Sequence, residues 1–177
     1  MVKRLLDGLN LIDYEIFCDE RGSLLPLEFE NISKSTGCKS IVQANITNSK
    51  LGVIRGMHWQ SYPFIQGKFI ICLSGKIVDI ALDIRPSSST FGSYFSVNLS
   101  GDERKAFWIP AGFAHGFQTV SNNSTVAYLV DAPFNINASH CIHPLDKDLN
   151  LPWNNSIVPI LSKKDADGIG FKDFLNQ

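Results

Sequence analysis

His58 lies in "GVIRGMHWQ", residues 52 to 60, an otherwise apolar stretch that also holds Arg55. An imidazole titrates near neutral pH, so this side chain could take a proton from a substrate as a general base. A histidine among apolar residues is more often a hydrogen-bonded core side chain, and the stretch alone leaves both interpretations open. Arg55 and Lys68 would by default be solvated charges, but their apolar neighbours favour a role inside the fold.

A second histidine, His115, follows Pro110 and Gly112 in "WIPAGFAHGF". This Pro-x-Gly-x-x-His spacing resembles the second conserved motif of the cupin barrels. Cupins that bind a metal also carry a first motif of His-x-His followed by a carboxylate, whereas this chain has His58-Trp59-Gln60 and then Lys68. First-row metals need three or four N, O or S ligands, and a lysine ammonium repels a cation. We therefore expect no metal at this position.

The residues around these motifs alternate with period two, the pattern of short strands. In "KIVDIALDI", residues 76 to 84, the apolar side chains share one face, which predicts a half-buried strand. Further strands with turn residues between them are predicted at "KFIICL", "SYFSVNL", "KAFWI", "HGFQTV" and "TVAYLV". Only "ENISKSTG" and the C-terminal "SKKDADGIGFKDFL" are helix candidates. The pattern predicts an all-β antiparallel sandwich or barrel with short peripheral helices.

Length and composition limit the class of protein. A chain of 177 residues is long enough for one domain with a real core, so we expect residues 1–177 to form a single domain. With 16 basic and 17 acidic residues there is no long-range field to attract nucleic acid or an anionic membrane. Asp7 and Asp13 interrupt the N-terminal apolar run, so neither a signal peptide nor a membrane span is expected. The four scattered cysteines favour a reducing compartment, and we expect a cytoplasmic location.

Eight motifs, in the same order and at close to the same spacing, resemble the dTDP-4-dehydrorhamnose 3,5-epimerase family. They are "DERG" (19 to 22), "VQAN" (42 to 45), "GVIRGMHWQ", "QGK" (66 to 68), "VDIALDIRPSSSTFG" (78 to 92), "FWIPAGFAHGF" (107 to 117), Tyr128 and "PILSKKD" (159 to 165). The resemblance implies a cupin barrel, a double-stranded β-helix of jelly-roll-like form. It also implies a cofactor-free isomerase, usually a homodimer, that epimerises a nucleoside-diphosphate 4-keto-6-deoxy sugar.

The chemistry of such a sugar defines the catalytic groups that are needed. A 4-ketone acidifies the protons on C3 and C5, so inversion needs a base on one face, a group that stabilises the enolate, and an acid on the other face. The resemblance assigns the base to His58 and its orienting carboxylate to Asp165. It assigns Lys68 to the enolate oxygen and Tyr128 to the acid. Two simpler interpretations stay open: Ser162 to Asp165 has the spacing of a capping box, and Tyr128 could be a packed strand residue.

The same resemblance implies how substrate is bound. Two arginines are expected at the diphosphate, where a guanidinium can pair with two oxygens at once. Two amides are expected at the nucleotide, and His115 beside the sugar or merely bracing its turn. The residues expected to bind substrate are Arg21, Glu28, Gln43, Asn45, Arg55, Gln66, His115 and Phe134. His140 and His143 match no motif and are predicted to be surface residues.

Two departures from the family pattern affect the substrate. Leu129 and Phe134 stand where the family commonly has Lys and a second Tyr, which leaves open whether C3, C5 or both are inverted. Leu24 and Pro26 fall where the family has an aromatic and a carboxylate that recognise thymine. A CDP-linked sugar is therefore an alternative, because cytosine has no N3 proton for a carboxylate to accept. Glu28 could supply the acceptor if the loop shifts.

Three other functions remain as alternatives. The stretch "RGSLLPLE" also resembles the sugar-nucleotide 3,4-ketoisomerases, although those usually carry His-x-His where this chain has His58-Trp59-Gln60. A non-catalytic cupin that only binds a sugar nucleotide is a second alternative, and a metal-dependent cupin oxygenase is a third. The epimerase is the best match to the residues.

Overall fold

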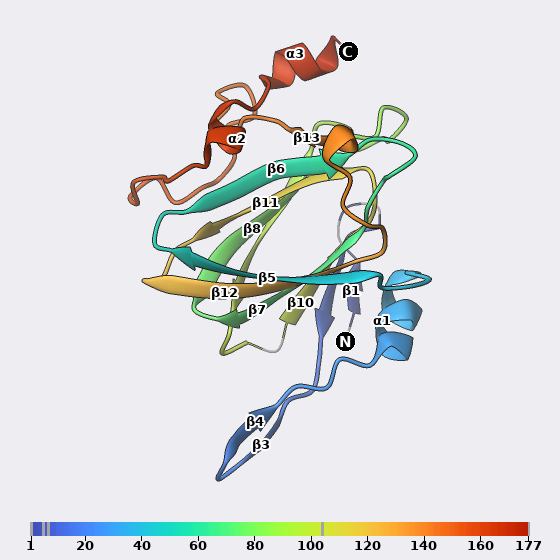
Figure 1. The fold of residues 1–177 in the computed structure, drawn as a ribbon, viewed down its shortest axis with the longest axis vertical. Coiled ribbons are helices and arrows are strands. Elements are labelled where there is room, and N and C mark those ends of the chain that lie inside the picture. The colour runs from blue at the N-terminus through green and yellow to red at the C-terminus, as the bar shows by residue number, and fades with distance from the viewer. Residues whose placement is uncertain (1, 5, 7, 104, 177) are drawn as a thin grey trace.

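Two facing β-sheets make up most of the computed structural model, which describes residues 2–4, 6, 8–103 and 105–176 (Figure 1). In sheet order, the six-stranded sheet contains β1 (Val2–Arg4), β2 (Asn10–Asp13), β10 (Lys105–Ile109), β7 (Lys68–Ser74), β12 (Asn123–Val130) and β5 (Gln43–Lys50). The five-stranded sheet contains β13 (Ser139–Cys141), β6 (Ile54–Gln60), β11 (Phe113–Thr119), β8 (Lys76–Asp83) and β9 (Tyr94–Ser100). The prediction of an all-β, jelly-roll-like cupin barrel is confirmed.

Large apolar side chains from both sheets fill the space between them. The cluster includes Leu9, Ile70, Phe107, Phe113 and Val126, each at most 3% exposed. Burying a side chain of this size stabilises the fold by about 1.5–3 kcal/mol. This core holds the two sheets in a fixed relation, so that side chains projecting from opposite sheets can meet.

Strand β8 is buried on both faces, so the prediction of a half-buried strand was wrong. Ile80 and Leu82 do not face the space between the sheets; they pack on the opposite side against Leu151 and Trp153 of the C-terminal segment. The C-terminal segment thus covers the outer face of the strand. The face that carries Asp79 points inward, where that carboxylate is fully buried. Two-sided burial of a strand removes the solvent-facing row that alternation normally indicates.

Short elements surround the barrel. They are helices α1 (Phe29–Thr36), α2 (Lys163–Ala166) and α3 (Phe171–Leu175), the 3-10 turn η1 (Ile136–Ala138), and the hairpin formed by β3 (Phe17–Asp19) and β4 (Gly22–Leu24). The hairpin extends away from the barrel, while α2 and α3 lie near β6 (Figure 1). The helical C-terminal segment divides in two around Gly168 and Gly170, with Gly170 at the N-cap of α3. None of the helices in the described part of the chain has the length and apolar character that crossing a membrane requires.

Strands β6 and β11 approach each other unusually closely at two glycines. A Cβ at Gly56 would lie 2.4 Å from the Cα of Gly116, and Gly56 has a φ of +133°, which L side chains rarely adopt. The pairing register shifts between His115 and Phe117 at the same place. On one side of this irregularity His115 is the direct partner of His58. The glycine contact therefore helps to bring both histidines to one part of the barrel.

Candidate active site

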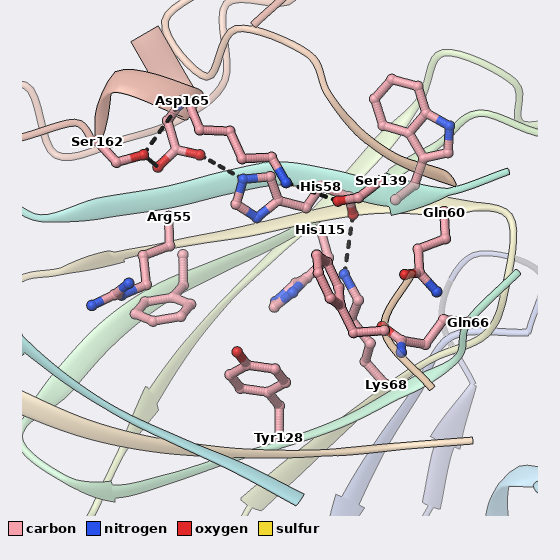
Figure 2. Close-up of a pocket in the computed structure, with 14 residues that line it drawn as sticks. Arg55, His58, Gln60, Gln66, Lys68, His115, Tyr128, Ser139, Ser162 and Asp165 are labelled. Atoms are coloured by element: carbon pink, nitrogen blue, oxygen red, sulfur yellow. Dashed lines mark hydrogen bonds and ion pairs between the residues drawn. The ribbon is translucent and has the colours of Figure 1, made fainter. Parts of the chain in front are cut away.

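A cavity of about 320 Å³ opens between the sheets, with β6 and β11 on one side and β7 and β12 on the other (Figure 2). Its lining residues are Arg55, His58, Trp59, Gln60, Gln66, Lys68, His115, Phe117, Tyr128, Phe134, Ser139, Ser162, Lys164 and Asp165. All four residues that the sequence assigns to catalysis are in this set. Residues from separate parts of the chain thus meet around one cavity.

His58 is paired with a nearly buried carboxylate. Its Nε2 lies 2.5 Å from Oδ1 of Asp165, and its other ring nitrogen, Nδ1, points into the cavity (Figure 2). Ser162 is the N-cap of α2: its Oγ accepts from the Asp165 backbone N–H and donates to Oδ2 of the same residue at 2.7 Å. The capping interaction expected from the spacing and the contact with His58 therefore occur together. The cap holds the carboxylate still while it orients the imidazole.

The electrostatics of this pair suit a base. Burial lowers the pKa of His58, although the bond to Asp165 acts in the opposite direction. Burial alone would raise the pKa of Asp165, but hydrogen bonds from His58 and Ser162 outweigh it and hold that pKa below its usual value. At neutral pH the pair is therefore a neutral imidazole beside a carboxylate. With Nε2–H donated to Asp165, the lone pair on Nδ1 is directed at the cavity.

Lys68 supplies a cation beneath the imidazole. Its Nζ donates to the backbone carbonyl of His58 at 3.1 Å. Burial lowers its pKa to about 8, while the carboxylate of Asp79 partly opposes that shift. A buried ammonium near neutral pH is well placed to stabilise negative charge that develops on a substrate oxygen.

Tyr128 faces His58 from the opposite sheet, across the cavity (Figure 2). Burial raises the pKa of its phenol, and the nearby Arg55 acts against that shift. The phenol therefore stays protonated at neutral pH. A neutral imidazole on one wall and a phenol on the other form a base and an acid on opposite faces of whatever occupies the cavity.

His115 belongs to a second histidine–carboxylate pair. Its Nε2 lies 3.0 and 3.1 Å from the two carboxylate oxygens of Asp79, which is fully buried on β8. His115 also lines the cavity. Asp79 was missed by the sequence analysis. The available signal was its place on the polar face of "KIVDIALDI", a face that the structure directs into the barrel.

Strand β5 pairs with β12 next to the cavity, although none of its own residues is among those that line it. The register pairs Asn45 with Tyr128, so the two side chains share a face of the sheet. Gln43 donates its amide to Oδ1 of Asn45 at 2.7 Å. Arg55, on the opposing sheet, donates through Nε to Oγ of Ser49 at 3.0 Å. Of the polar side chains predicted to bind nucleotide and diphosphate, Arg55 thus lines the cavity, and Asn45 lies beside Tyr128 with Gln43 bonded to it.

Gln66 and Gln60 connect two loops at the mouth of the cavity. The Gln66 amide donates to the carbonyl of Ala132 at 2.5 Å. The Gln60 amide donates to the carbonyls of Phe64 and Pro133, and its own oxygen accepts from a backbone N–H. Gln66 therefore has a structural bond in addition to its position in the lining.

Arg21 and Glu28, both expected to bind substrate, lie outside the cavity. Arg21 is on the β3–β4 hairpin, where its side chain is 85% exposed and ion-paired with Asp19. Glu28 occupies the N-cap position of α1 and accepts from the amide of Asn31 at 2.7 Å. Within one chain, neither residue reaches the groups that line the cavity.

Six lining residues were not predicted as site residues from the sequence: Trp59, Gln60, Phe117, Ser139, Ser162 and Lys164. Lys164 donates from Nζ to Oγ of Ser139 at 2.8 Å, and its Nζ lies 5.8 Å from the centre of the Phe134 ring. Trp59 stacks on His140, which is exposed as predicted, with ring centroids 5.3 Å apart. Lys164 could have been proposed from its place next to Asp165. For Ser139 and Trp59 the sequence offers no comparable signal.

Comparison with known proteins gives consistent matches. The family model described as dTDP-4-dehydrorhamnose 3,5-epimerase matches residues 3–173. The enzyme of that name from Shigella flexneri is 35% identical over 98% of this chain and 96% of its own. The Legionella pneumophila dTDP-6-deoxy-D-glucose-3,5-epimerase, solved with dTDP-4-keto-L-rhamnose, is 36% identical over 97% of this chain and 92% of its own, with a TM-score of 0.91. A 3'-monoepimerase from Streptomyces bikiniensis, solved with dTDP-quinovose, is 27% identical over 99% of this chain and 91% of its own, also with a TM-score of 0.91.

Proposed function

Because this chain belongs to the dTDP-4-dehydrorhamnose 3,5-epimerase family, we propose that it epimerises a dTDP-linked 4-keto-6-deoxyhexose. The observation that carries the proposal is the placement of His58 and Tyr128 on opposite walls of one cavity, with Lys68 between the sheets (Figure 2). Inverting a carbon requires removal of its proton from one face and return of a proton to the other. The cavity provides one group for each of these tasks.

The reaction follows from the positions of these groups. Nδ1 of His58 takes the proton from a carbon next to the C4 ketone, and the C–H electron pair becomes the enolate double bond as charge moves to the ketone oxygen. The ammonium of Lys68 stabilises that oxygen. The phenol of Tyr128 then gives its proton to the opposite face of the same carbon, and the ketone re-forms with inverted configuration. Solvent returns both residues to their starting protonation states.

We propose a homodimer in which the β3–β4 hairpin of each protomer reaches the cavity of its partner. Phe17 and Leu24 on this hairpin are 58% and 65% exposed, more than apolar side chains normally are without a partner. Arg21 lies on the same hairpin, which extends away from the barrel (Figure 1), and its side chain is 85% exposed. A hairpin exchanged between protomers would cover the apolar pair and bring Arg21 to the diphosphate of the substrate on the partner.

The thymidine nucleotide is preferred over cytidine because the matched relatives are named for dTDP sugars. The same matches favour epimerisation over 3,4-ketoisomerisation. Relatives that invert both carbons and a relative that inverts one are both among them, so the proposed reaction is inversion at C3, C5 or both. We further propose that residues 1–177 act as one domain, as the family match over residues 3–173 supports. Four free cysteines support a cytoplasmic site of action.

Incubation in heavy water tests the proposal. dTDP-4-keto-6-deoxyglucose and its CDP analogue are supplied in parallel, and deuterium at C3 and C5 is followed by proton NMR. We expect exchange with the dTDP sugar, and loss of that exchange in a folded His58→Ala variant. Retained exchange in that variant would remove His58 from the role of base. Binding of the dTDP sugar without exchange would instead support the non-catalytic alternative.

A further inference from the structure

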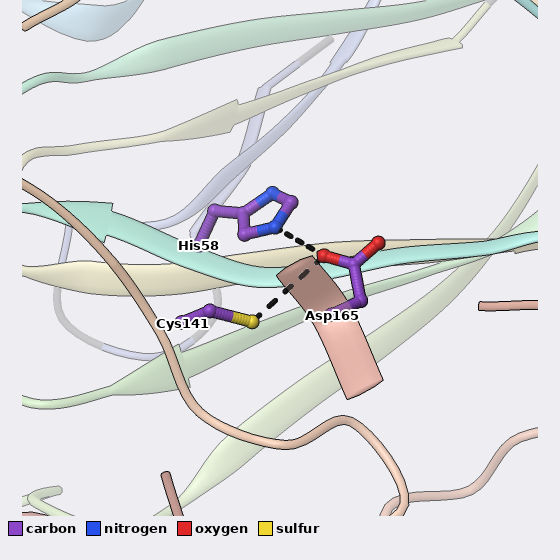
Figure 3. Close-up of side chains that lie close together, drawn as sticks. All are labelled: His58, Cys141 and Asp165. Atoms are coloured by element: carbon purple, nitrogen blue, oxygen red, sulfur yellow. Dashed lines mark hydrogen bonds and ion pairs between the residues drawn. The ribbon is translucent and has the colours of Figure 1, made fainter. Parts of the chain in front are cut away.

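Behind the catalytic imidazole lies a thiol that the proposed reaction does not use. Strand β13 pairs with β6 so that Cys141 is the direct partner of His58. Its Sγ lies 3.8 Å from Oδ1 of Asp165, the same oxygen that contacts the imidazole (Figure 3). Cys141 is 8% exposed, and its thiol also lies within hydrogen-bonding distance of the carbonyls of Gly56 and Ile142. An imidazole, a thiol and a carboxylate therefore meet at one point.

We propose that His58, Cys141 and Asp165 form a binding site for Zn²⁺, and that occupation of this site inhibits the enzyme. One ligand atom of each residue lies within 4.8 Å of the others, and this is the group with such spacing among the residues that the structure describes. Nitrogen, sulfur and oxygen donors are those that zinc prefers, and three protein ligands with a fourth open position are a common zinc arrangement. The inhibitory effect rests on the proposed function, since it depends on His58 acting as the base.

The geometry requires only small movements. Zinc bond lengths of about 2.0–2.3 Å place tetrahedral donors roughly 3.3–3.7 Å apart. The contact of 2.5 Å between His58 and Asp165 must therefore widen by about 1 Å, which a small rotation of these side chains provides. The Asp165 carboxylate keeps its bond from Ser162 through the other oxygen, Oδ2. His58 and Asp165 both line the cavity, so an ion arriving from that side meets them directly and the cavity can supply a water as fourth ligand.

The charges can also balance. Burial beside Asp165 raises the pKa of the Cys141 thiol to about 12, so in the metal-free enzyme the group holds one negative charge, on the carboxylate. Zinc displaces the thiol proton, which passes to solvent, and it binds the Nε2 lone pair of His58 while the imidazole proton moves from Nε2 to Nδ1. The resulting thiolate and carboxylate neutralise the ion. Lys68 and Lys164 stand nearby and oppose its entry, which suits a site that takes up metal reversibly rather than one that always holds it.

This site differs from the metal position of the cupin barrels. That position uses two histidines of one strand, and no metal is expected there because Trp59 and Gln60 follow His58. The donors of the proposed zinc site come instead from β6, β13 and α2. Bound zinc would hold the imidazole and block its part in proton transfer. The proposal therefore concerns an inhibitor and leaves the cofactor-free reaction unchanged.

Cobalt spectroscopy tests binding without reference to activity. The protein carries Cys18→Ser throughout, because Cys18 is exposed and would bind soft metals by itself. We expect Co²⁺ to bind with one-to-one stoichiometry and to show a thiolate-to-cobalt charge-transfer band. Cys141→Ser should remove the band and weaken the affinity for zinc by at least about 100-fold, since even residues that only hydrogen-bond to the ligands of a metal contribute 10–100-fold to its affinity. Cys72→Ser is the matched control: its thiol is also buried but donates to Ser74 and is not in the metal-binding group.

Activity is measured after loading with zinc and removal of free ion, with each variant compared with its own metal-free rate. We expect the loaded enzyme to lose most of its exchange activity and to regain it when EDTA is added. Absence of the charge-transfer band, or equal zinc binding by Cys141→Ser, would overturn the proposal. Full activity of an enzyme that is shown to hold zinc at Cys141 would also overturn the proposal. If the metal-free enzyme shows no exchange at all, the proposed function fails, while the spectroscopic result still decides the metal site.

Discussion

Tyr128 and His58 differ in what each can do alone, and this difference is measurable. In the proposed reaction, proton removal needs only the imidazole, whereas inversion needs a proton delivered from the opposite wall, where the phenol lies (Figure 2). The two steps are therefore separable by substitution. A deuterium label at C3 or C5 reports the first step, and the configuration of the product reports the second.

Tyr128→Phe should retain exchange of the substrate proton but lower the rate of inversion by about 10²–10⁴, the usual contribution of a positioned acid. Proton NMR in heavy water measures exchange and product in one sample. Tyr62→Phe is the matched control, because Tyr62 is 86% exposed and lies outside the lining. Inversion at an unchanged rate would show that water or another group supplies the proton.

The sequence could predict those site residues that stand in recognisable motifs. His58, Lys68, Tyr128 and Asp165 were proposed in this way, and the structure places all four around one cavity. Asp79 could not be proposed with the same clarity, because its pairing with a histidine depends on the register between β8 and β11. A register is a property of two strands together, and neither strand's own sequence states it.

Partners contributed by neighbouring strands and loops escaped prediction for the same reason. Cys141 comes beside His58 only because β13 pairs with β6, and Ser139 meets Lys164 only after α2 has packed against the barrel. Two of the expected binding residues, Arg21 and Glu28, are placed by elements that lie away from the cavity. A motif predicts which side chain is needed more readily than it predicts which chain or element will deliver it.

At the scale of elements, the contact between β6 and β11 is the least tolerant part of the barrel. Gly56→Ala places a methyl group 2.4 Å from the Cα of Gly116, and neither backbone can move without disturbing a buried strand. We expect a loss of about 3 kcal/mol or more in the free energy of unfolding, measured by urea denaturation. Gly22→Ala is the control, since Gly22 has a similar φ of +129° but open space around it. The Gly22→Ala variant should lose only about 1–2 kcal/mol of the free energy of unfolding. Equal losses in the two variants would show that backbone strain alone, without the steric contact, causes the destabilisation.

The last residue of β8, Asp83, carries a buried carboxylate whose contribution to the stability of the fold depends on pH. Asp83 is fully buried and accepts hydrogen bonds from Arg85, Ser88 and Thr90. Burial alone would raise its pKa, but these bonds outweigh burial and hold the pKa far below its usual value. A carboxyl whose pKa is depressed on folding contributes stability above the unfolded pKa of about 4 and loses it as the pH falls toward the folded pKa.

Asp83→Asn should therefore lower the free energy of unfolding by about 2–3 kcal/mol at pH 7. Below about pH 4 the difference in free energy of unfolding between the variant and the parent protein should become smaller. Urea denaturation across a pH series measures both effects. Asp148→Asn removes an exposed carboxylate that pairs with Lys172, and it should change stability by less than about 1 kcal/mol at any pH. If the difference in free energy of unfolding between Asp83→Asn and the parent protein stays constant down to about pH 3, the introduced amide, and not the lost charge, causes the destabilisation.

The C-terminal segment explains why element prediction succeeded for most strands and failed for β8. Alternation identifies a strand when one face meets water, and most predicted strands lie where they were expected. In β8 the outward face is covered by residues that include Leu149 and Trp153, some seventy positions later in the chain. Burial of that face depends on a long-range contact, which period-two alternation does not report.

At the scale of the whole molecule, the proposed exchange of hairpins predicts complementation between two defective chains. In a dimer of Arg21→Ala with His58→Ala, one site combines an intact cavity with an intact hairpin, and the other site carries both lesions. Random pairing makes half of all dimers mixed, so co-expression should restore about a quarter of the parent kcat/KM. Exchange at low substrate concentration measures this recovery.

A second mixture serves as the control for complementation. His58→Ala and Asp165→Asn both alter the cavity, so a dimer that combines them has no intact site and should recover nothing. Recovery in the first mixture alone would support the exchanged hairpin. If neither mixture recovers, Arg21 acts on the substrate of its own chain, or not at all.

The position of Asp165 in the chain has a consequence for the order in which the enzyme is made. Every strand of both sheets precedes this residue, since the last of them, β13, ends at Cys141. The carboxylate is therefore made after all the strands that form the walls of the cavity, and it reaches His58 only when α2 packs near β6 (Figure 1). Until then His58 has no orienting partner from α2. A barrel whose α2 has not yet packed thus lacks the oriented imidazole that the proposed reaction requires, and docking of this one short helix completes the site.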